Sequence, residues 1–499
     1  MNNRFNICAV VATCYFLLLA TGCKTIQSTT SNLVPTPIVN NGALTFKQTA
    51  LPEDVLPIWS YLDLVSDSIS GMSLDKAKQI VANKKVKPLI VAVIDSGTDL
   101  EHEVLQGLVW SNPKEVVGNQ KDDDSNGYID DINGWNFLAD AYGAPLAITR
   151  LVAKCEELCT EENRKDTFCS RCEPLQKEYD VASEKASEAY SNTVHWYNEA
   201  TTSEAHKLAY DHILALNQYH YNPLYNPREI IGDNVNDLND KYYGNNSVLP
   251  QEKSETHGTH VAGIAVKITR QFTDAIKYLP IRAIPNGDEY DKDVALAIRY
   301  AVDSGAKVIN MSFGKAYSEH PDWVQEAIKY AASKDVLMVH AAGNNSKNID
   351  ESKVFPNDQN ANDNEIADNM ITVGAITRYF NEALVSEFSN YGEKNVDIFA
   401  PGSKIYSALP NNEYGYQQGT SMAAPAVAAV AGLVRSYYPK LSASQVKHIL
   451  MNSGIEVPFE VYVPGKPGEK QPFSELCKSG RILNAYNALL MAEKMSKNK

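Results

Sequence analysis

Residues 88–97 read Pro88-Leu-Ile-Val-Ala-Val-Ile-Asp-Ser-Gly97, a nearly continuous apolar run that ends in an acidic residue. A short apolar run bounded by proline and glycine predicts a strand that is buried on both faces of a parallel sheet. Similar runs occur at residues 307–311, 336–340 and 370–373. Helical patterns occur at residues 294–304, 323–333 and 422–437. Strands that alternate with helices predict an α/β fold whose central parallel sheet is covered on both faces.

Three short motifs supply the residue types of a nucleophilic acyl-transfer site. They are Val93-Ile-Asp95-Ser-Gly97, His257-Gly-Thr-His260-Val-Ala-Gly263 and Gly419-Thr-Ser421-Met-Ala-Ala-Pro425. A serine hydroxyl is a weak nucleophile that needs a general base, and a histidine oriented by a carboxylate supplies one. We therefore expect Ser421 as the nucleophile, His257 as the base and Asp95 as the group that orients the imidazole. Ser421 opens an apolar helix with Pro425 in its first turn, where N–H groups can face an oxyanion.

These motifs, in the chain order Asp, His, Ser, resemble those of the subtilisin-like serine proteases, the subtilases. The resemblance covers roughly residues 91–134 and 257–485. It implies a three-layer α/β fold with a central parallel sheet and an Asp95, His257 and Ser421 triad. It also implies a serine endopeptidase that cleaves proteins or peptides through an acyl-enzyme intermediate.

Two further segments resemble parts of the subtilase site. Asn344, in Ala341-Ala-Gly-Asn344, is implied as an oxyanion donor together with the Ser421 N–H. The segment Ser312-Phe313-Gly314 is implied to lie on an edge strand that pairs with the substrate backbone. In a parallel sheet, Asp95, Ser312 and Asn344 would all lie at the carboxyl ends of strands, where such folds place their sites.

Three alternatives differ in the residues that they require. A non-catalytic peptide-binding protein on a subtilase scaffold would have a broken triad or oxyanion site, and neither is broken in this sequence. An α/β-hydrolase esterase would have G-x-S-x-G and the order Ser, Asp, His. A metal hydrolase that used His257 and His260 would have H-E-x-x-H, which the chain lacks.

Residues 144–231 contain no glycine and are rich in Ala, Glu, Lys and Tyr, which predicts a helical insertion in the catalytic domain. Whether the insertion is only a surface helix or has a docking role stays open. Its four cysteines are Cys155, Cys159, Cys169 and Cys172. A helical hairpin favours the nested disulfides Cys155–Cys172 and Cys159–Cys169, which an exported protein can form, while other pairings and a zinc site remain open. Cys477 is expected to be a small buried residue.

An acidic loop carries candidate calcium ligands. Val104 stands where many subtilases have an acidic calcium ligand, so that family site is in doubt. The loop resembles the start of an EF-type calcium loop, but Asn133 stands where its bidentate glutamate would be. Its candidate ligands are Asp122, Asp124, Asn126 and Asp131, and a weaker second set is Asp233, Asp237 and Asp240. A solvated acidic turn is the alternative, and no organic cofactor is expected.

The first 22 residues resemble an export signal. Arg4 is their only charged residue, and the apolar run from Ile7 to Ala20 is too short to span a bilayer comfortably. Ala20-Thr-Gly-Cys23 resembles a bacterial lipobox, which predicts lipidation of Cys23 and anchoring in the cell envelope on its periplasmic or cell-surface face. An ordinary secretory signal is the alternative.

The 499 residues are therefore expected to form one interrupted catalytic domain rather than three domains. The expected parts are a signal (1–22), a tether (23–52), two catalytic parts (53–143 and 232–490) that flank the insertion (144–231), and a tail (491–499). The short segment before the first buried strand predicts no large autocleaved pro-domain. The net charge of −15 disfavours nucleic acid as a partner.

Overall fold

The computed structural model describes residues 51–160, 167–197, 204–252 and 254–497. The predicted signal, Cys23 and nearly all of the predicted tether lie outside the described residues. Among the helices of the described ranges, none combines the length and the apolar character needed to cross a membrane.

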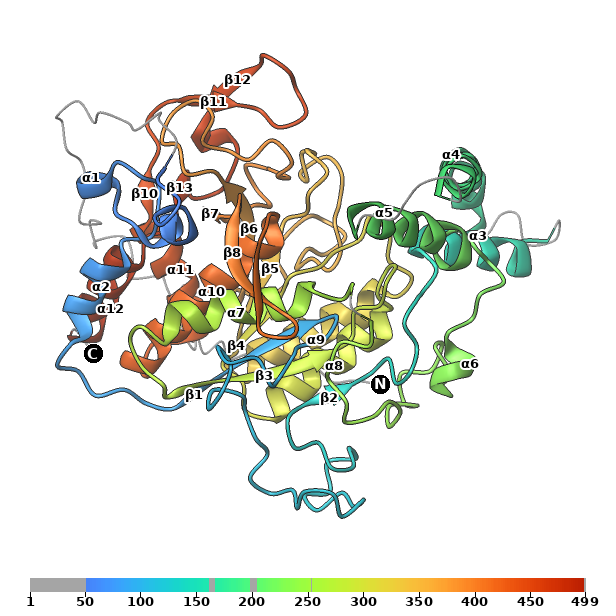
Figure 1. Cartoon of the computed structure of the whole chain (residues 1–499), viewed down its shortest axis with the longest axis horizontal. Helices are drawn as coiled ribbons and strands as arrows, with labels where there is room; N and C mark the ends of the chain where they lie inside the picture. Colours follow the sequence, from blue (N-terminus) through green and yellow to red (C-terminus); the bar gives the residue numbers. More distant parts are fainter. Residues whose placement is uncertain (1–50, 161–166, 198–203, 253, 498–499) are drawn as a thin grey trace, which may run out of the picture. The chain divides into compact units, whose positions relative to one another are not determined.

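A nine-stranded, mostly parallel sheet forms the centre of the described chain (Figure 1). In sheet order its strands are β10 (Ile455–Glu456), β13 (Arg481–Ile482), β7 (Ile398–Pro401), β6 (Met370–Ile376), β5 (Leu337–Ala341), β4 (Val308–Met311), β1 (Leu89–Asp95), β3 (Ile276–Arg282) and β2 (Trp135–Asn136). Only the pairing of β10 with β13 is antiparallel. The predicted runs form β1, β4, β5 and β6, whereas β3 and β7 were not predicted.

The sheet is buried on both faces because its side chains alternate between two apolar clusters. In β1, Val91 and Val93 belong to one cluster, and Ala92 and Ile94 belong to the other. The first cluster contains residues of α7 (His257–Thr269), α10 (Thr420–Tyr437), α11 (Ala443–Ser453), α12 (Ala485–Lys497) and α2 (Leu74–Val81). The second contains residues of α8 (Asp291–Asp303) and α9 (Pro321–Ser333). This is the three-layer α/β fold that the sequence predicts.

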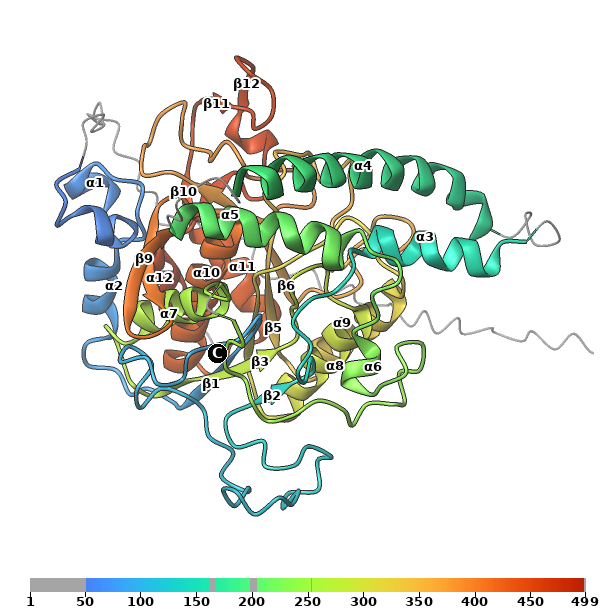
Figure 2. The ribbon, with the colours of Figure 1, turned by 45° about the vertical axis from the view of Figure 1, so that its right-hand side comes forward.

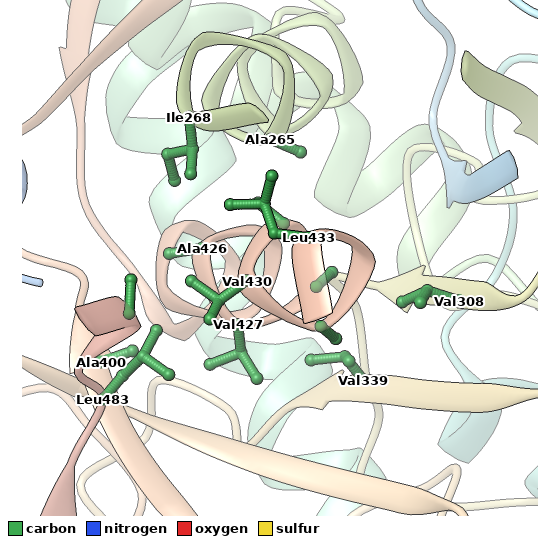
Figure 3. Packing of buried hydrophobic residues seen from close by; sticks show 14 of the residues in the cluster. Ala265, Ile268, Val308, Val339, Ala400, Ala426, Val427, Val430, Leu433 and Leu483 are labelled. Carbon is green, nitrogen blue, oxygen red and sulfur yellow. The ribbon is translucent and has the colours of Figure 1, made fainter. Parts of the chain in front are cut away.

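Helix α10 lies at the centre of the first cluster. Its residues Val427 and Leu433 are fully buried, and small alanines between them allow close contact with α7 and with the strands. Figure 3 shows this packing, with Ile268 of α7 on one side of α10 and Val339 of β5 on the other. Because α10 begins at the third motif, this packing fixes the position of Ser421.

The insertion is helical, as predicted. Its elements are α3 (Ala147–Leu158), α4 (Cys172–Tyr197), α5 (Glu204–Ala215), the π-helix η4 (Leu216–His220) and the short α6 (Arg228–Ile231). Figure 2 shows α4 and α5 next to each other, and they are in contact. Disulfides join Cys155 to Cys172 and Cys159 to Cys169, which is the nested pairing that the sequence favours.

The predicted C-terminal tail is not separate from the domain. Helix α12 runs from Ala485 to Lys497, across the boundary predicted after residue 490. Met491 and Ala492 belong to the first apolar cluster, so the hydrophobic effect holds this helix in the core. The remaining elements are η2 (Leu56–Tyr61), α1 (Leu64–Asp67), η3 (Cys169–Arg171), β8 (Ile405–Leu409), β9 (Glu413–Gln417), β11 (Glu460–Tyr462), β12 (Lys470–Pro472) and η5 (Phe473–Glu475).

Candidate active site

Asp95 and His257 form a hydrogen-bonded pair at the carboxyl end of β1. The distance between Asp95 Oδ1 and His257 Nδ1 is 2.7 Å. Asp95 is the last residue of β1, and His257 is the first residue of α7. A Cβ atom at Gly258 would lie 2.1 Å from the carbonyl oxygen of Gly97, so only glycine lets α7 begin this close to β1.

The electrostatics of this pair suit a general base. Burial lowers the pKa of His257, but the charge of Asp95 and the hydrogen bond to it outweigh burial and raise this pKa above its usual value. Since Nδ1 faces the carboxylate, a neutral His257 donates from Nδ1 and keeps a free lone pair on Nε2. The geometry therefore leaves Nε2 as the basic nitrogen.

Ser421 lies in the first turn of α10, and it contacts the segment that follows β4. Its hydroxyl donates to the carbonyl oxygen of Ser312 at 3.0 Å, and no hydrogen bond joins Ser421 to His257 within the described ranges. Pro425 lies inside α10 and not in its first turn as expected. Because proline has no N–H, it leaves the Ser421 carbonyl free, and this carbonyl accepts a hydrogen bond from Ser312 Oγ at 2.8 Å.

The side chain of Asn344 is oriented by the start of α10. Its Oδ1 accepts hydrogen bonds from Thr420 N at 2.8 Å and from Thr420 Oγ1 at 3.0 Å. This leaves the Nδ2 donors directed away from Thr420, and no acceptor for them occurs among the described residues. The N–H of Ser421 is in the first helical turn, where such groups lack an acceptor within the helix.

Gly419 keeps open the space between these donors. It has a φ of +151°, and a Cβ atom there would lie 3.3 Å from Asn344 Nδ2 and 3.6 Å from Ser421 N. A side chain at this position would therefore lie between the two groups that could bind an oxyanion. The arrangement supplies two convergent donors beside a serine hydroxyl, which suits acyl transfer.

The segment Ser312–Gly314 does not belong to an edge strand, contrary to the expectation. Strand β4 ends at Met311 and lies inside the sheet between β1 and β5. Phe313 and Gly314 follow it, and the carbonyl oxygen of Phe313 accepts a hydrogen bond from His340 Nε2 at 2.8 Å. Asp95 is the last residue of β1, and Ser312 and Asn344 follow the neighbouring strands β4 and β5, so all three lie at the carboxyl ends of adjacent strands.

His260 does not form a metal-binding pair with His257. It is fully buried, and its Nε2 lies 3.1 Å from the carbonyl oxygen of Ile405 and 3.2 Å from that of Gly415. Burial lowers the pKa of His260 to about 4, so the ring is neutral and donates from Nε2. The metal-hydrolase alternative therefore loses one of its two ligands.

The acidic loop gathers three carboxylates, and one of them was not predicted. Single oxygens of Glu115, Asp122 and Asp124 all lie within 4.8 Å of one another. Glu115 is 9 % exposed, and its Oε2 is a buried oxygen without a hydrogen-bond partner in the described chain. Burial raises the pKa of Glu115, and the charges of Asp131 and Asp124 add to this shift. A cation would relieve both effects, so these oxygens fit a calcium ion.

All four predicted calcium ligands contact protein groups: Asp122 accepts from Gly127 N at 2.7 Å, and Asp124 lies 3.8 Å from Lys114 Nζ. Asp131 accepts hydrogen bonds from Asn112, Asn126 and Tyr300 and lies outside the three-carboxylate group. The Asn126 side chain accepts from Tyr128 N and donates to Asp131, so it stabilises the fold of the loop. Glu115 precedes the loop, and no EF-type spacing points to it. An acidic residue just before an acidic loop was the only signal in the sequence.

The weaker second set of acidic residues does not form a cation site. Asp233 is paired with two buried cations, Arg228 at 3.2 Å and Lys292 at 2.8 Å. Asp240 lies 3.8 Å from Lys292, and Asp237 accepts a hydrogen bond from Asn239 N. Two protein cations already neutralise this site, so a metal ion has no place there.

The comparisons with known proteins agree with this geometry. The sequence model of the Subtilase family matches residues 87–472. A thermophilic serine proteinase of Bacillus sp. (strain AK1) is 42 % identical over 187 residues, which are 36 % of this chain and 42 % of that protein. Thermitase of Thermoactinomyces vulgaris is 35 % identical over 219 residues, which are 42 % of this chain and 71 % of that protein.

The extent of these matches differs between relatives. The chain spans less than half of the length of the Bacillus sp. proteinase. A solved structure of a protease from Pseudoalteromonas arctica matches 87 % of this chain and 96 % of its own, with 19 % identity and a TM-score of 0.46.

Proposed function

Because the chain belongs to the subtilase family, we propose that it is a serine endopeptidase that hydrolyses peptide bonds in proteins or peptides. The observation that carries this proposal is the 2.7 Å contact between Asp95 and His257, at the same sheet edge as Ser421 and Asn344. A non-catalytic peptide-binding protein would not need a histidine whose pKa is raised by a carboxylate.

The proposed reaction begins when the Ser421 hydroxyl leaves the Ser312 carbonyl and donates to His257 Nε2. Ser421 Oγ then attacks the substrate carbonyl carbon while His257 takes its proton, and Asp95 stabilises the imidazolium. The N–H of Ser421 and Asn344 Nδ2 donate to the oxyanion of the tetrahedral intermediate. His257 returns the proton to the leaving amine, and water repeats the sequence on the acyl-enzyme.

Turnover of an unstructured protein substrate tests this proposal. The wild-type chain is expected to release peptides, and His257→Ala and Ser421→Ala are expected to lose nearly all of this activity, with only the residual catalysis of the oxyanion donors left. His448→Ala, which changes an exposed histidine paired with Asp368, is the matched control and should keep wild-type turnover. Equal turnover by wild type and Ser421→Ala would contradict the proposal.

We further propose that calcium binds to Glu115, Asp122 and Asp124. The unpartnered Glu115 oxygen and the close approach of three carboxylates support this. Calcium would supply positive charge that stabilises the loop; the loop lies outside the catalytic residues, so no reaction step involves this ion. Calcium takes several further oxygen ligands, which backbone carbonyls and water provide in such loops.

We also propose that the chain is exported and attached to a bacterial membrane through a lipid on Cys23. The lipobox-like Ala20-Thr-Gly-Cys23 after an apolar run supports this proposal. Metabolic labelling with a fatty acid is expected to mark the wild type but not Cys23→Ser, and only the wild type should sediment with membranes. Cys477→Ser is the control, since it removes a buried cysteine instead. Sedimentation of Cys23→Ser with membranes would contradict lipid anchoring.

A further inference from the structure

A cavity of about 500 Å³ lies between the helical insertion and the catalytic histidine. Its core side includes Tyr142, Glu252, Ser254, Glu255, His257 and Asn286. Its other side is formed by residues of α5 and η4, which include Lys207, Asp211 and Tyr219. The volume is in the range of ligand pockets. Whatever fills this cavity lies directly beside the reacting atoms, because the His257 side chain forms part of its wall.

Hydrogen bonds hold the insertion wall against the segment that follows β3. Asn286 Oδ1 lies 3.2 Å from His220 Nε2, and Asn286 Nδ2 donates to Tyr142 Oη at 3.2 Å. Tyr142 Oη also lies 3.0 Å from Ser254 Oγ. A Cβ atom at Gly143 would lie 2.4 Å from the ring of Tyr219, so Gly143 allows this ring to pack against the backbone. The wall is therefore built at the point where α5 gives way to a π-helix, an irregularity common at functional sites.

The first helix of the insertion, α3, is also bonded to the catalytic part of the chain. Arg150 of α3 donates to the carbonyl oxygens of Asp288 and Glu289, and it pairs with Glu319 at 2.6 Å. One disulfide joins Cys155 of α3 to Cys172 at the start of α4, and the other joins Cys159, just after α3, to Cys169 of η3. Helix α5 also packs against α4, and Figure 2 shows the two helices side by side.

Among the lining residues that the structure describes, the unpaired charge is negative. Glu255 is neutralised by the buried Arg282 at 2.9 Å, and Asp211 pairs with Lys207 at 3.7 Å. The carboxylate of Glu252 accepts no hydrogen bond from any residue that the structure describes. Glu252 and Tyr219 both line the cavity. Burial raises the pKa of Tyr219, and Tyr142 and the charge of Glu252 add to the shift. An acidic cavity with tyrosine rings suits a cationic side chain.

We propose that this cavity is a substrate side-chain subsite, made jointly by the insertion and the catalytic core, that accepts lysine or arginine close to the cleaved bond. The proposal rests on the proposed protease function and adds its substrate preference. The insertion, for which the sequence leaves a role open, then acts as a specificity element. Glu252 contacts the substrate side chain, and Tyr219 shapes the wall beside it.

Digestion of a peptide library by the full-length protein tests this subsite. The wild type is expected to cleave peptides that have Lys or Arg at one fixed position within about two residues of the cut, because His257 forms part of the cavity wall. In Glu252→Gln, kcat/KM for such peptides should fall roughly two- to fivefold, the effect of one exposed charge. The same peptides with Gln at that position should be cleaved at an unchanged rate. Glu184→Gln, on an exposed part of α4, is the matched control.

Asp211→Asn is a second variant of the cavity wall. It leaves Lys207 unpaired in the wall, so it should reduce the preference for basic residues further.

The outcomes distinguish the subsite proposal from the proposed protease function. If wild type reacts with a fluorophosphonate serine probe but shows no basic preference, or if both variants keep that preference, the subsite is overturned while the protease function stands. If folded wild type does not react with the probe, the protease function itself is overturned.

Discussion

Ser312 and Ser421 are joined by two hydrogen bonds of opposite direction. Ser312 Oγ donates to the Ser421 carbonyl oxygen at 2.8 Å, and Ser421 Oγ donates to the Ser312 carbonyl oxygen at 3.0 Å. The first bond exists because Pro425 cannot donate to the Ser421 carbonyl in the helical pattern. In the second bond, the Ser421 hydroxyl donates to Ser312 and not to His257. A helix irregularity thus links the end of β4 to the start of α10.

Ser312→Ala is expected to destabilise the protein. It leaves the Ser421 carbonyl oxygen buried without a donor, which costs about 1–3 kcal/mol of unfolding free energy. Ser312→Thr keeps the hydroxyl and should retain most of the stability. Urea unfolding of both variants measures the difference, and an unchanged midpoint for Ser312→Ala would show that the bond contributes nothing.

Asp95→Asn is expected to lower both the activity and the pKa of His257. Without the carboxylate the favoured tautomer is lost, and kcat should fall by roughly 10⁴-fold. In wild type the raised pKa of His257 means that activity is lost as the pH falls through a value above the ordinary one for histidine. In Asp95→Asn the remaining activity should persist to lower pH. A pH profile of kcat/KM checks this, and an acid limb at the same pH in both proteins would contradict it.

Asn344→Ala is expected to lower kcat by about 10²–10³-fold with little change in KM, since its Nδ2 donors act on the oxyanion of the transition state. Asn345→Ala is the matched control, because this neighbouring side chain is also exposed and makes no hydrogen bond through its side chain within the described chain. Steady-state kinetics on one peptide measure both variants. Equal losses of kcat in both would contradict a role for Asn344 in the oxyanion hole.

Chelation of calcium is expected to lower the midpoint of thermal unfolding of wild type, because a ligand that binds only the folded state stabilises it. In Glu115→Gln the midpoint should already be lower, and the chelator should shift it less. Asp140→Asn, a carboxylate outside the three-carboxylate group, should respond like wild type. A wild-type midpoint that does not move with chelator would remove the calcium site.

The predictable part of the fold follows from strands buried on both faces. The apolar residues of β1, β4, β5 and β6 form continuous runs because helices cover both sides of the sheet. Strand β3 was not predicted because it contains Lys277, Pro280 and Arg282, which interrupt its apolar pattern. The neighbouring strand β2 is only two residues long and pairs with Ile281 and Arg282, not with Pro280. Proline has no N–H to donate, so β3 tolerates it where β2 forms no ladder hydrogen bond. Arg282 is fully buried, where Glu255 neutralises its charge and the carbonyl oxygen of Ser96 accepts a further hydrogen bond from it.

The residues of the candidate site also divide into those that the sequence predicts and those that only the structure shows. Asp95, His257, Ser421 and Asn344 were predicted because each lies in a short local motif, and the structure brings Asp95 and His257 together. Glu115 and the wall formed by Tyr219 could not be predicted, because their roles depend on contacts between segments far apart in the chain. The place of Ser421 Oγ on the Ser312 carbonyl is of the same kind.

Covalent labelling of the nucleophile tests the central claim most directly. Folded wild-type protein and Ser421→Ala are each incubated with a fluorophosphonate probe, and the labelled residue is identified by mass spectrometry of the digested chain. The serine-protease account predicts one labelled residue in wild type, Ser421, and no label in Ser421→Ala. Unlabelled wild-type protein with an intact fold, or equal labelling of both proteins, would contradict it.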